Sequence, residues 1–359
     1  MEKIRAGIIG CGGIANGKHM PAIRHVKEIE LKAFCDLIPE RAKKAANEYG
    51  TADAVCYSDY RALLEDPALD AVYVCTPNRS HSEIAVAALK AGKHVMCEKP
   101  MAINYAEAQK MVQAAKESGK ILTIGYQNRY RQDSLYLKKE CQAGALGDIY
   151  FGRAQAIRRR GVPTWGVFLN EYEQGGGPLI DIGTHALDLT LWCMDNYRPK
   201  YAVGSVFHKL NSQTEPGNMF GPWEPEKFTV EDSAFGYIVM ENGAAIILES
   251  SWALNCLDVG EAITMLCGTK AGADMKDGLR INGVLHDAQF VTRPAFQAGG
   301  VDFYSGETAD APTLEQKTFA NAILGKGELT VLPEQAAVVT RILDAVYESA
   351  RTGKPVYFD

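Results

Sequence analysis

Hydrophobic residues in the first third of the chain form two alternating patterns. Short, mainly apolar runs that predict strands occur at 4–9, 31–36, 54–57, 71–75, 93–97 and 121–124. The run 71–75 is apolar throughout, which is typical of a parallel strand covered on both faces. Between them, apolar residues at helical spacing predict helices, the clearest at 39–49, 81–91 and 105–117. This alternation of strand and helix predicts an α/β domain over residues 1–124, built on a doubly wound parallel sheet.

The pattern changes from Asp148 onward, where strands become longer and helices rarer. Strands are expected at 149–158, 201–208, 233–241, 244–252, 262–268 and 279–281, and helices at 182–193, 313–324 and 334–351. Asn242-Gly243 is a strong hairpin signal and therefore predicts antiparallel pairing. We expect a second domain, 125–359, of the α+β type: a large, mostly antiparallel, open-faced sheet with helices on one side.

Both faces of the two strands joined by this hairpin look apolar. Ala234, Gly236, Ile246 and Leu248 alternate with other apolar residues. An antiparallel sheet leaves its uncovered face to solvent or to a partner. We therefore expect a homodimer or homotetramer that forms through the sheet of the second domain.

Composition narrows the class of protein. The chain has 359 residues, 47% of them hydrophobic, and a net charge of −6. Arg158-Arg159-Arg160 is the only basic cluster, which argues against a nucleic-acid surface, and no apolar run approaches the length of a membrane span. Nine scattered cysteines without a C-x-x-C pair indicate neither a disulfide framework nor a metal site. The chain opens directly on a strand, without a signal peptide, so we expect a soluble cytoplasmic protein.

The first strand ends in a glycine turn, Gly10-x-Gly12-x-x-Ala15, followed by a helix start. In such a turn the first glycine permits the bend, the second lets a pyrophosphate approach the backbone, and the small third residue lets helix and strand pack closely. Asp36, which ends the second strand, lies where a ribose-binding carboxylate belongs. A glycine turn without a ligand is the alternative interpretation.

Ligands of open α/β sheets bind beyond the carboxyl ends of the strands. One of these ends carries Glu98-Lys99-Pro100. A lysine there, near a cofactor, can have a lowered pKa and exchange protons. It is equally able to cap the following helix or to form an ion pair with Glu98.

The densest polar cluster of the second domain lies within Gly177–Asp188. Asp181 and His185 are four residues apart and would share one helix face, so that the carboxylate holds a donor while histidine moves a proton. The alternative is a capping aspartate and a structural core histidine. Asp188, one turn further along, is expected to be structural.

Together these motifs resemble one family over essentially the whole chain: the glucose–fructose oxidoreductase / inositol dehydrogenase / rhizopine catabolism (Gfo/Idh/MocA) family of NAD(P)-dependent sugar and polyol dehydrogenases. Gly10–Ala15 matches its N-terminal fingerprint, Glu98-Lys99-Pro100 its E-K-P motif, and Asp181-x-Gly183-x-His185 its D-x-G-x-H motif. The resemblance implies a Rossmann domain, a Lys99–Pro100 bond that is typically cis, and Lys99, Asp181 and His185 as catalytic residues.

The resemblance also implies hydride transfer between nicotinamide and a hydroxyl-bearing carbon of a sugar, polyol or inositol. The expected cofactor-binding residues are Gly10, Gly12, Gly13, Ile14, Ala15, Asp36, Thr76, Pro77, Asn78, His81, Glu98 and Lys99. Because a carboxylate repels a 2′-phosphate, Asp36 favours NAD over NADP, although Arg41 on the next helix is placed to help NADP.

The substrate is less readable from the sequence. The expected substrate-binding residues are Lys99, Tyr126, Asn128, Arg129, Arg160, Trp165, Asp181 and His185. Trp165 is placed to stack on a sugar face and the arginines to bind hydroxyls or a phosphate, or this segment is a basic solvated loop. Two other functions remain open: an NAD-dependent glycoside hydrolase that oxidises its sugar transiently, and a non-catalytic dinucleotide sensor, against which the three catalytic candidates argue.

Overall fold

The computed structural model describes residues 3–213, 217–296 and 310–358. The chain forms two compact units, one of Met1–Tyr130 with Ala309–Ala337 and one of Arg131–Thr308 with Val338–Asp359. The expected single boundary after residue 124 therefore differs from the structure, because a late segment returns to the first unit. The third crossing between the units falls within helix α10 (Pro333–Thr352).

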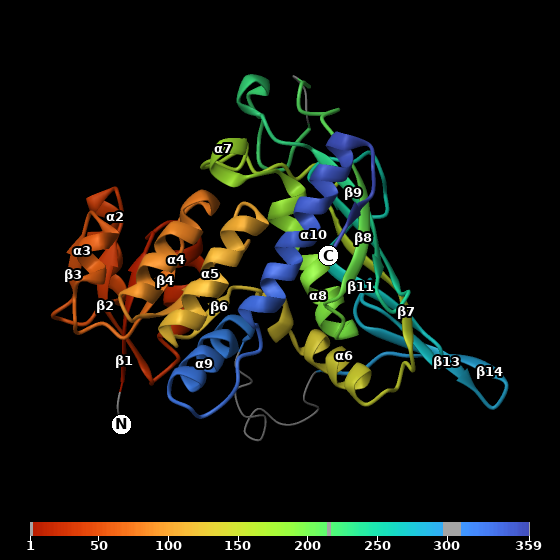
Figure 1. Cartoon of the computed structure of the whole chain (residues 1–359), viewed down its shortest axis with the longest axis horizontal. Coiled ribbons are helices and arrows are strands. Elements are labelled where there is room, and N and C mark those ends of the chain that lie inside the picture. Colours follow the sequence, from red (N-terminus) through yellow and green to blue (C-terminus); the bar gives the residue numbers. More distant parts are fainter. Residues whose placement is uncertain (1–2, 214–216, 297–309, 359) are drawn as a thin grey trace. The chain divides into compact units, whose positions relative to one another are not determined.

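The first unit contains a six-stranded sheet in the order β3-β2-β1-β4-β5-β6, in which every pair is parallel (Figure 1). Its strands are β1 (Ile4–Ile9), β2 (Ile29–Cys35), β3 (Val55–Tyr57), β4 (Ala71–Val74), β5 (His94–Cys97) and β6 (Leu122–Ile124). This is the strand order of the dinucleotide-binding fold, which confirms the doubly wound parallel sheet.

Helices accompany these strands, and those expected at 39–49, 81–91, 105–117 and 313–324 begin and end close to these residues. They are a π-helical turn at Ala15–His19 continuing into α1 (Met20–Ile23), α2 (Pro39–Tyr49), α3 (Tyr60–Leu64), α4 (His81–Lys90), α5 (Tyr105–Ser118) and α9 (Ala311–Ile323). Short 3-10 turns lie at Asn78–Ser80 and Gln127–Tyr130. The Asn104 side chain caps α5 by accepting from the Glu107 N–H.

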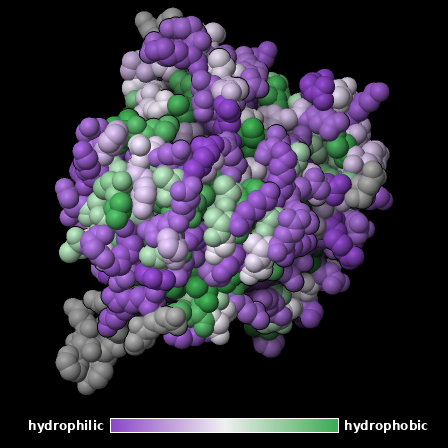
Figure 2. All heavy atoms as spheres, turned by 60° about the vertical axis from the view of Figure 1, so that its left-hand side comes forward, coloured by the Kyte–Doolittle hydropathy of each residue, from purple (hydrophilic) through white to green (hydrophobic). Residues whose placement is uncertain are grey.

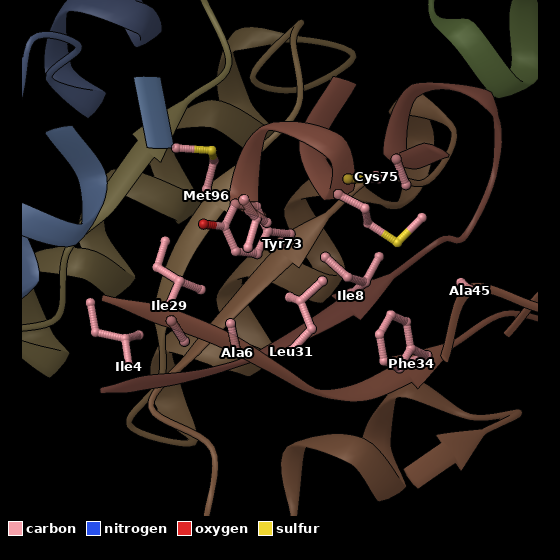
Figure 3. Close-up of a cluster of buried hydrophobic side chains, with 14 of the residues drawn as sticks. Ile4, Ala6, Ile8, Ile29, Leu31, Phe34, Ala45, Tyr73, Cys75 and Met96 are labelled. Carbon is pink, nitrogen blue, oxygen red and sulfur yellow. The ribbon is translucent and has the colours of Figure 1, made fainter. Parts of the chain in front are cut away.

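The core of the first unit lies between its sheet and the covering helices. Ile8, Phe34 and Tyr73, from three adjacent strands, are fully buried there (Figure 3). Phe319 and Ala320 of α9 are buried in the same cluster. This burial of apolar surface explains why α9, almost two hundred residues beyond β6, belongs to the first unit rather than to the second.

The second unit contains a nine-stranded sheet in the order β14-β13-β12-β11-β7-β10-β9-β8-β15. Its strands are β7 (Ile149–Ile157), β8 (Pro199–Phe207), β9 (Ser233–Met240), β10 (Ala245–Ser251), β11 (Gly260–Gly268), β12 (Ala271–Asp274), β13 (Arg280–Leu285), β14 (Ala288–Thr292) and β15 (Val356–Tyr357). All pairs are antiparallel except β7 with β10. The expected mostly antiparallel sheet is confirmed, and the 242–243 hairpin joins β9 to β10.

The helices of the second unit are α6 (Gln132–Gln142), α7 (Glu171–Gln174), a π-helical turn at Leu179–Gly183 continuing into α8 (Thr184–Met194), and most of α10. α8 packs against β7 and β11 (Figure 1). Val346 of α10 packs against Gly204 of β8 and Gly236 of β9. Helix α6 and strands β12 and β14 were not expected, and the helical run that was expected from Ile182 begins three residues earlier.

The side of the molecule seen in Figure 2 is mainly hydrophilic, with apolar residues scattered over it. Among the described residues, no helix is long and apolar enough to cross a membrane.

Candidate active site

The glycine turn of the first unit lies directly after β1. Gly10 has φ +92°, and a Cβ there would lie 2.6 Å from the carbonyl oxygen of Cys75, so only glycine fits. A Cβ on Gly12 or Gly13 would meet no described atom within 4 Å. The backbone here borders open space next to a helix start, which fits the pyrophosphate of a dinucleotide.

Asp36 follows β2 and is tied to this turn. Its Oδ2 accepts from the Cys11 N–H at 2.9 Å, and its Oδ1 accepts from the Ile38 N–H at 2.9 Å. These bonds fix the half-buried carboxylate beside the turn. Because each carboxylate oxygen has two lone pairs, both oxygens remain able to accept from a ribose hydroxyl.

The segment after β4 carries Thr76, Pro77, Asn78 and His81. Pro77 is exposed, Thr76 is half-buried, and Asn78 and His81 are buried. His81 Nε2 lies 2.9 Å from the Thr76 carbonyl oxygen, and its Nδ1 lies 2.8 Å from the Pro100 carbonyl oxygen. Burial lowers the pKa of His81, although the two carbonyl oxygens favour the protonated ring. The ring therefore links the turn after β4 to the turn after β5.

The turn after β5 is Glu98-Lys99-Pro100, and its Lys99–Pro100 bond is cis, as the family resemblance implies. Lys99 is half-buried, whereas Glu98 is only 4% exposed. Glu98 Oε1 contacts Lys18 Nζ at 2.6 Å and His19 Nε2 at 2.7 Å, and Oε2 accepts from the Lys99 N–H at 3.1 Å. The Glu98 carboxylate is thus surrounded by groups of the protein itself.

The charge of Lys18 decides the ionisation of Glu98. Burial alone would raise the pKa of the Glu98 carboxyl, but the nearby Lys18 ammonium and hydrogen bonds from His19 and Lys18 hold it well below its usual value. Burial likewise disfavours the charged form of Lys18, yet Glu315 and Glu98 raise its pKa. The result is a buried ion pair directly under the Lys99 turn.

In the second unit, Asp181 and His185 lie on the helical run that begins at Leu179, and both are buried. Trp252, which follows β10 and is fully buried, donates its Nε1–H to Asp181 Oδ2 at 3.1 Å. Since Pro178 occupies the N-cap position, Asp181 is a residue of the first helical turn and not its cap.

A second buried carboxylate, Glu231, holds the start of this helix. Its Oε2 accepts from the Gly177 N–H at 2.7 Å, and its Oε1 accepts from the Leu179 N–H at 3.1 Å and the Tyr347 hydroxyl at 2.8 Å. A Cβ on Gly177 would lie 2.4 Å from the Glu231 carbonyl oxygen, so the glycine permits this approach. Burial raises the pKa of Glu231, and these neutral donors do not reverse the shift.

Arg158, at the end of β7, is a charged group near Asp181. Its Nε and Nη2 groups donate to Glu261 Oε2 and Oε1, each at 2.6 Å, and Nη1 donates to the Gly161 carbonyl oxygen at 2.9 Å. Burial works against its charge, but the hydrogen bond and charge of Glu261, with a smaller contribution from Asp181, raise its pKa. The guanidinium therefore stays positive beside the Asp181 helix.

The other expected substrate-binding residues differ in accessibility. Tyr126 and Arg129 are fully buried, and Arg129 Nη1 donates to the Thr330 carbonyl oxygen and the Gln335 side chain at 2.8 and 2.7 Å. These contacts give Arg129 a structural role in the first unit. Asn128 is half-buried, and Trp165 is 53% exposed. Arg160 is half-buried and donates to Asn255 Oδ1 at 2.6 Å.

Sequence reasoning missed four residues that hold the candidate site segments: Lys18, His19, Glu231 and Trp252. Lys18 and His19 directly precede the apolar residues of α1, a pattern that could have indicated buried partners. Glu231 lies immediately before an apolar strand, but nothing local in the sequence reveals its partners at Gly177 and Leu179.

Comparisons with known proteins identify the family of this chain. The model of the oxidoreductase family with an NAD-binding Rossmann fold matches residues 4–126, and that of the Gfo/Idh/MocA C-terminal domain matches residues 134–273. D-glucoside 3-dehydrogenase of Escherichia coli (strain K12) is 36% identical over 355 residues, covering 98% of this chain and 97% of that protein. Myo-inositol 2-dehydrogenase of Thermotoga maritima is 30% identical over 56% of this chain and 59% of its own length.

Solved structures show the same fold. An aldose-aldose oxidoreductase from Caulobacter crescentus, complexed with glycerol, superposes with a TM-score of 0.80 at 25% identity over 99% of this chain and all of that chain. A levoglucosan dehydrogenase in complex with NADH and L-sorbose superposes with a TM-score of 0.84 at 23% identity over the full length of both. These relatives are named as dehydrogenases and oxidoreductases, which favours hydride transfer over glycoside hydrolysis. With both domain models matched and a full-length relative at this identity, the chain belongs to the Gfo/Idh/MocA family of oxidoreductases, and its first unit is an NAD-binding Rossmann domain.

Proposed function

We propose that this protein transfers a hydride between the nicotinamide of NAD and a hydroxyl-bearing carbon of a sugar or sugar derivative, and that a glucoside is the first substrate to test. The observation that carries the proposal is the pair of motif segments: Lys99 follows β5 of an NAD-binding sheet, and Asp181 and His185 share the helix held by Glu231. The 36% identity to a D-glucoside 3-dehydrogenase along the whole chain supports the substrate class.

Lys99, Asp181 and His185 have separate roles in this proposal. When bound, the nicotinamide supplies the hydride acceptor. The ammonium of Lys99 donates to the substrate oxygen and stabilises the negative charge that develops there. His185 takes the hydroxyl proton, and Asp181, fixed by Trp252, orients the substrate.

The cofactor preference rests on Asp36. Its carboxylate is fixed beside the glycine turn, where it accepts from a ribose diol and repels a 2′-phosphate. We expect NAD to bind more tightly than NADP, and Asp36→Ser with Leu37→Arg to narrow or reverse this preference. Calorimetric titration of both cofactors measures it, and tighter binding of NADP by the unmodified protein would contradict it.

An aromatic series in the second unit supports a sugar substrate that carries a substituent. Trp165 and Phe220, 53% and 41% exposed, meet edge to face with ring centroids 4.9 Å apart. From Trp165 the series continues through Phe168 at 5.8 Å to Trp252 at 6.5 Å, and Trp252 holds Asp181. Exposed aromatic faces suit the apolar face of a sugar ring or of an aglycone.

Hydrogen bonds fix the loops that carry this series. Asn218 pairs with the backbone of Val162 in both directions, each at 2.9 Å, and the Thr164 hydroxyl donates to the Phe220 carbonyl oxygen at 2.6 Å. Trp165 and Phe220 are therefore held together before any ligand binds. We expect Trp165→Ala to raise KM for glucosides more than for free glucose.

Assembly of the protein is proposed on the uncovered face of the second sheet. Tyr237 and Phe207 there are 42% and 37% exposed, and Phe207 contacts Phe235 at 6.0 Å. The opposite face is covered by α8 and α10. We propose a homodimer or homotetramer formed through this face, and sedimentation of a monomer at micromolar concentration would count against it.

The function is tested with a panel of free sugars, inositols and glucosides, followed both by NADH absorbance and by product analysis. Lys99→Ala should lower kcat by about 10²–10³-fold and His185→Ala by about 10²–10⁴-fold, with little change in NAD affinity. The double variant should lose less than the product of the single losses, since both act in one transition state. Lys90→Ala and His208→Ala, at exposed positions, are the matched controls. Glycoside cleavage without net NADH formation would overturn the proposal in favour of the hydrolase.

A further inference from the structure

A buried cluster of polar side chains lies under the Lys99 turn and involves three distant segments of the first unit. Its members are Lys18 and His19 from the π-helical turn, Glu98 after β5, and Glu315 and Gln316 from α9, each less than 10% exposed. Placing charged groups in an interior is costly unless they are paired in good geometry. Because of this cost, we expect the cluster to have a role other than packing.

Lys18 makes a contact for each of its three ammonium protons. Its Nζ lies 2.6 Å from Glu98 Oε1, 3.1 Å from Glu315 Oε2 and 2.9 Å from Gln127 Oε1. A lysine ammonium has three donors and no acceptor, so this set satisfies it. Its position is thereby defined from three directions, and so is the position of the Glu98 carboxylate.

His19 adds a second contact to the same carboxylate oxygen. Gln316 Nε2 lies 3.1 Å from His19 Nδ1, and His19 Nε2 lies 2.7 Å from Glu98 Oε1. With the amide donating to Nδ1, the ring proton is on Nε2 and points at Glu98. The orientation of Glu98 thus depends on α9, more than two hundred residues away in the sequence.

The free end of Glu98 then acts on the backbone of Lys99. Glu98 Oε2 accepts from the Lys99 N–H at 3.1 Å, while on the other side of Lys99 the Pro100 carbonyl oxygen contacts His81 Nδ1 at 2.8 Å. The main chain at Lys99 is therefore held before and after its Cα. A side chain that starts from a fixed backbone has fewer positions to sample.

We propose that Lys18 and Glu98 are positioning residues for Lys99: Lys18 fixes the Glu98 carboxylate, and Glu98 fixes the Lys99 backbone, without Glu98 binding the cofactor. This inference rests on the proposed role of Lys99 in hydride transfer. It differs from the role implied by family resemblance, in which Glu98 lines the cofactor.

Glu98→Gln is the first test, because it keeps the shape of the side chain and removes its charge. We expect kcat to fall by about 10–100-fold, as for a small displacement of a reacting group, while the NAD dissociation constant stays near that of the unmodified enzyme. Lys18→Met should act in the same direction, and Lys18→Arg should restore part of the loss. Unchanged kcat in folded Glu98→Gln, or a weakened NAD affinity that accounts for the loss, would overturn the proposal.

Lys93→Met is the matched control. Lys93 is also buried, lies just before the opposite end of β5, and donates only to the Asp66 and Leu69 carbonyl oxygens. Its loss should lower stability without changing kcat. A similar fall of kcat in Lys93→Met and Lys18→Met would mean that both act through general destabilisation, and would overturn the positioning role.

Amide hydrogen exchange at Lys99 tests the same contact without any turnover. The Lys99 N–H should exchange faster in Glu98→Gln and Lys18→Met than in the unmodified protein. Its exchange rate should be unchanged in Lys93→Met. If the unmodified enzyme shows no NAD reduction with any sugar of the panel, but exchange at Lys99 changes in the variants as stated, the proposed function is wrong and the contact is confirmed. If turnover is present and Lys99 exchange is the same in all variants, the positioning role fails instead.

Discussion

The two units each bury one glutamate beside a proposed catalytic segment, and the two are held in opposite ways. Glu98 of the first unit is paired with the Lys18 ammonium at 2.6 Å, and its pKa lies well below the usual value. Glu231 of the second unit accepts from neutral donors, among them the Gly177 and Leu179 N–H groups and the Tyr347 hydroxyl, and its pKa is raised. Burial pushes both carboxyls in the same direction, so the difference comes from the cation.

This comparison shows that the donors around a buried acid matter more than its depth. Glu98 is 4% exposed and Glu231 2%. Neutral donors offset part of the cost of burying a charge, whereas a contacting ammonium reverses the shift. In the first unit, the Lys18 ammonium therefore joins distant segments through ion pairs. In the second unit, backbone N–H groups at the end of the glycine run bind the Glu231 carboxylate.

The largest effect is expected when the cation is removed. Lys18→Met leaves Glu98 and Glu315 buried without it, and breaking a buried pair in this way costs about 3–5 kcal/mol of unfolding free energy. Lys93→Met, which loses only contacts to carbonyl oxygens, should cost less. Urea unfolding of the two variants measures the difference. Equal losses would mean that Lys18 contributes no more than an ordinary buried donor.

The contributions of the two glutamates to the free energy of unfolding should change in opposite directions with pH. The folded pKa of Glu98 is lowered, so its contribution is present above the unfolded value of 4.5 and is lost as pH falls toward the folded pKa. The folded pKa of Glu231 is raised, so its contribution is present below 4.5 and is lost as pH rises through the folded value.

This prediction is measured by unfolding the parent protein, Glu98→Gln and Glu231→Gln at several pH values. The stability of the parent relative to Glu98→Gln should decrease in acid, and that relative to Glu231→Gln should increase. Parallel pH dependences in the two comparisons would show that the cation does not distinguish the sites.

Much of the first unit is readable from its sequence, because local signals and tertiary structure agree there. Mainly apolar runs become the strands of the parallel sheet, and Gly10 lies at the turn that only glycine permits. The packing of α9 on the first unit was not predicted. Phe319 of α9 contacts core residues that lie far from it in the sequence, and no local pattern indicates such contacts.

The second unit was predicted more coarsely. The 242–243 hairpin fixes the pairing of β9 with β10, but the parallel pairing of β7 with β10 involves segments about ninety residues apart and has no local signal. The sequence predicted the motif residues Lys99, Asp181 and His185. It did not predict the residues that hold their segments in place. Lys18 and Glu231 each act on segments that only the folded chain brings near them.

A moderate effect is expected when the charge of the second glutamate alone is removed. In Glu231→Gln the amide oxygen can still accept from Leu179 and Tyr347, but the amide nitrogen faces the Gly177 N–H. The Gly177 N–H then loses its acceptor and faces the N–H donors of the amide nitrogen, at a cost of about 1–3 kcal/mol. This is less than for Lys18→Met, because no buried charge loses its counter-ion. Urea unfolding at neutral pH checks the order, and a loss as large as that of Lys18→Met would contradict it.

The smallest effect should come from Tyr347→Phe, which removes one neutral donor from Glu231 and leaves both backbone N–H groups in place. A hydrogen bond of this kind is worth about 1 kcal/mol net. Because the hydroxyl also favours the charged carboxylate, its loss should raise the folded pKa of Glu231 further. Tyr357→Phe, at a tyrosine that is 65% exposed, is the control and should change neither quantity. Thermal unfolding, together with the pH dependence of stability, measures both effects. If Tyr347→Phe left the pH dependence of the parent unchanged, Glu231 would owe its state to the backbone donors alone, and the contrast with Glu98 would then lie between a cation and the N-terminus of a helix.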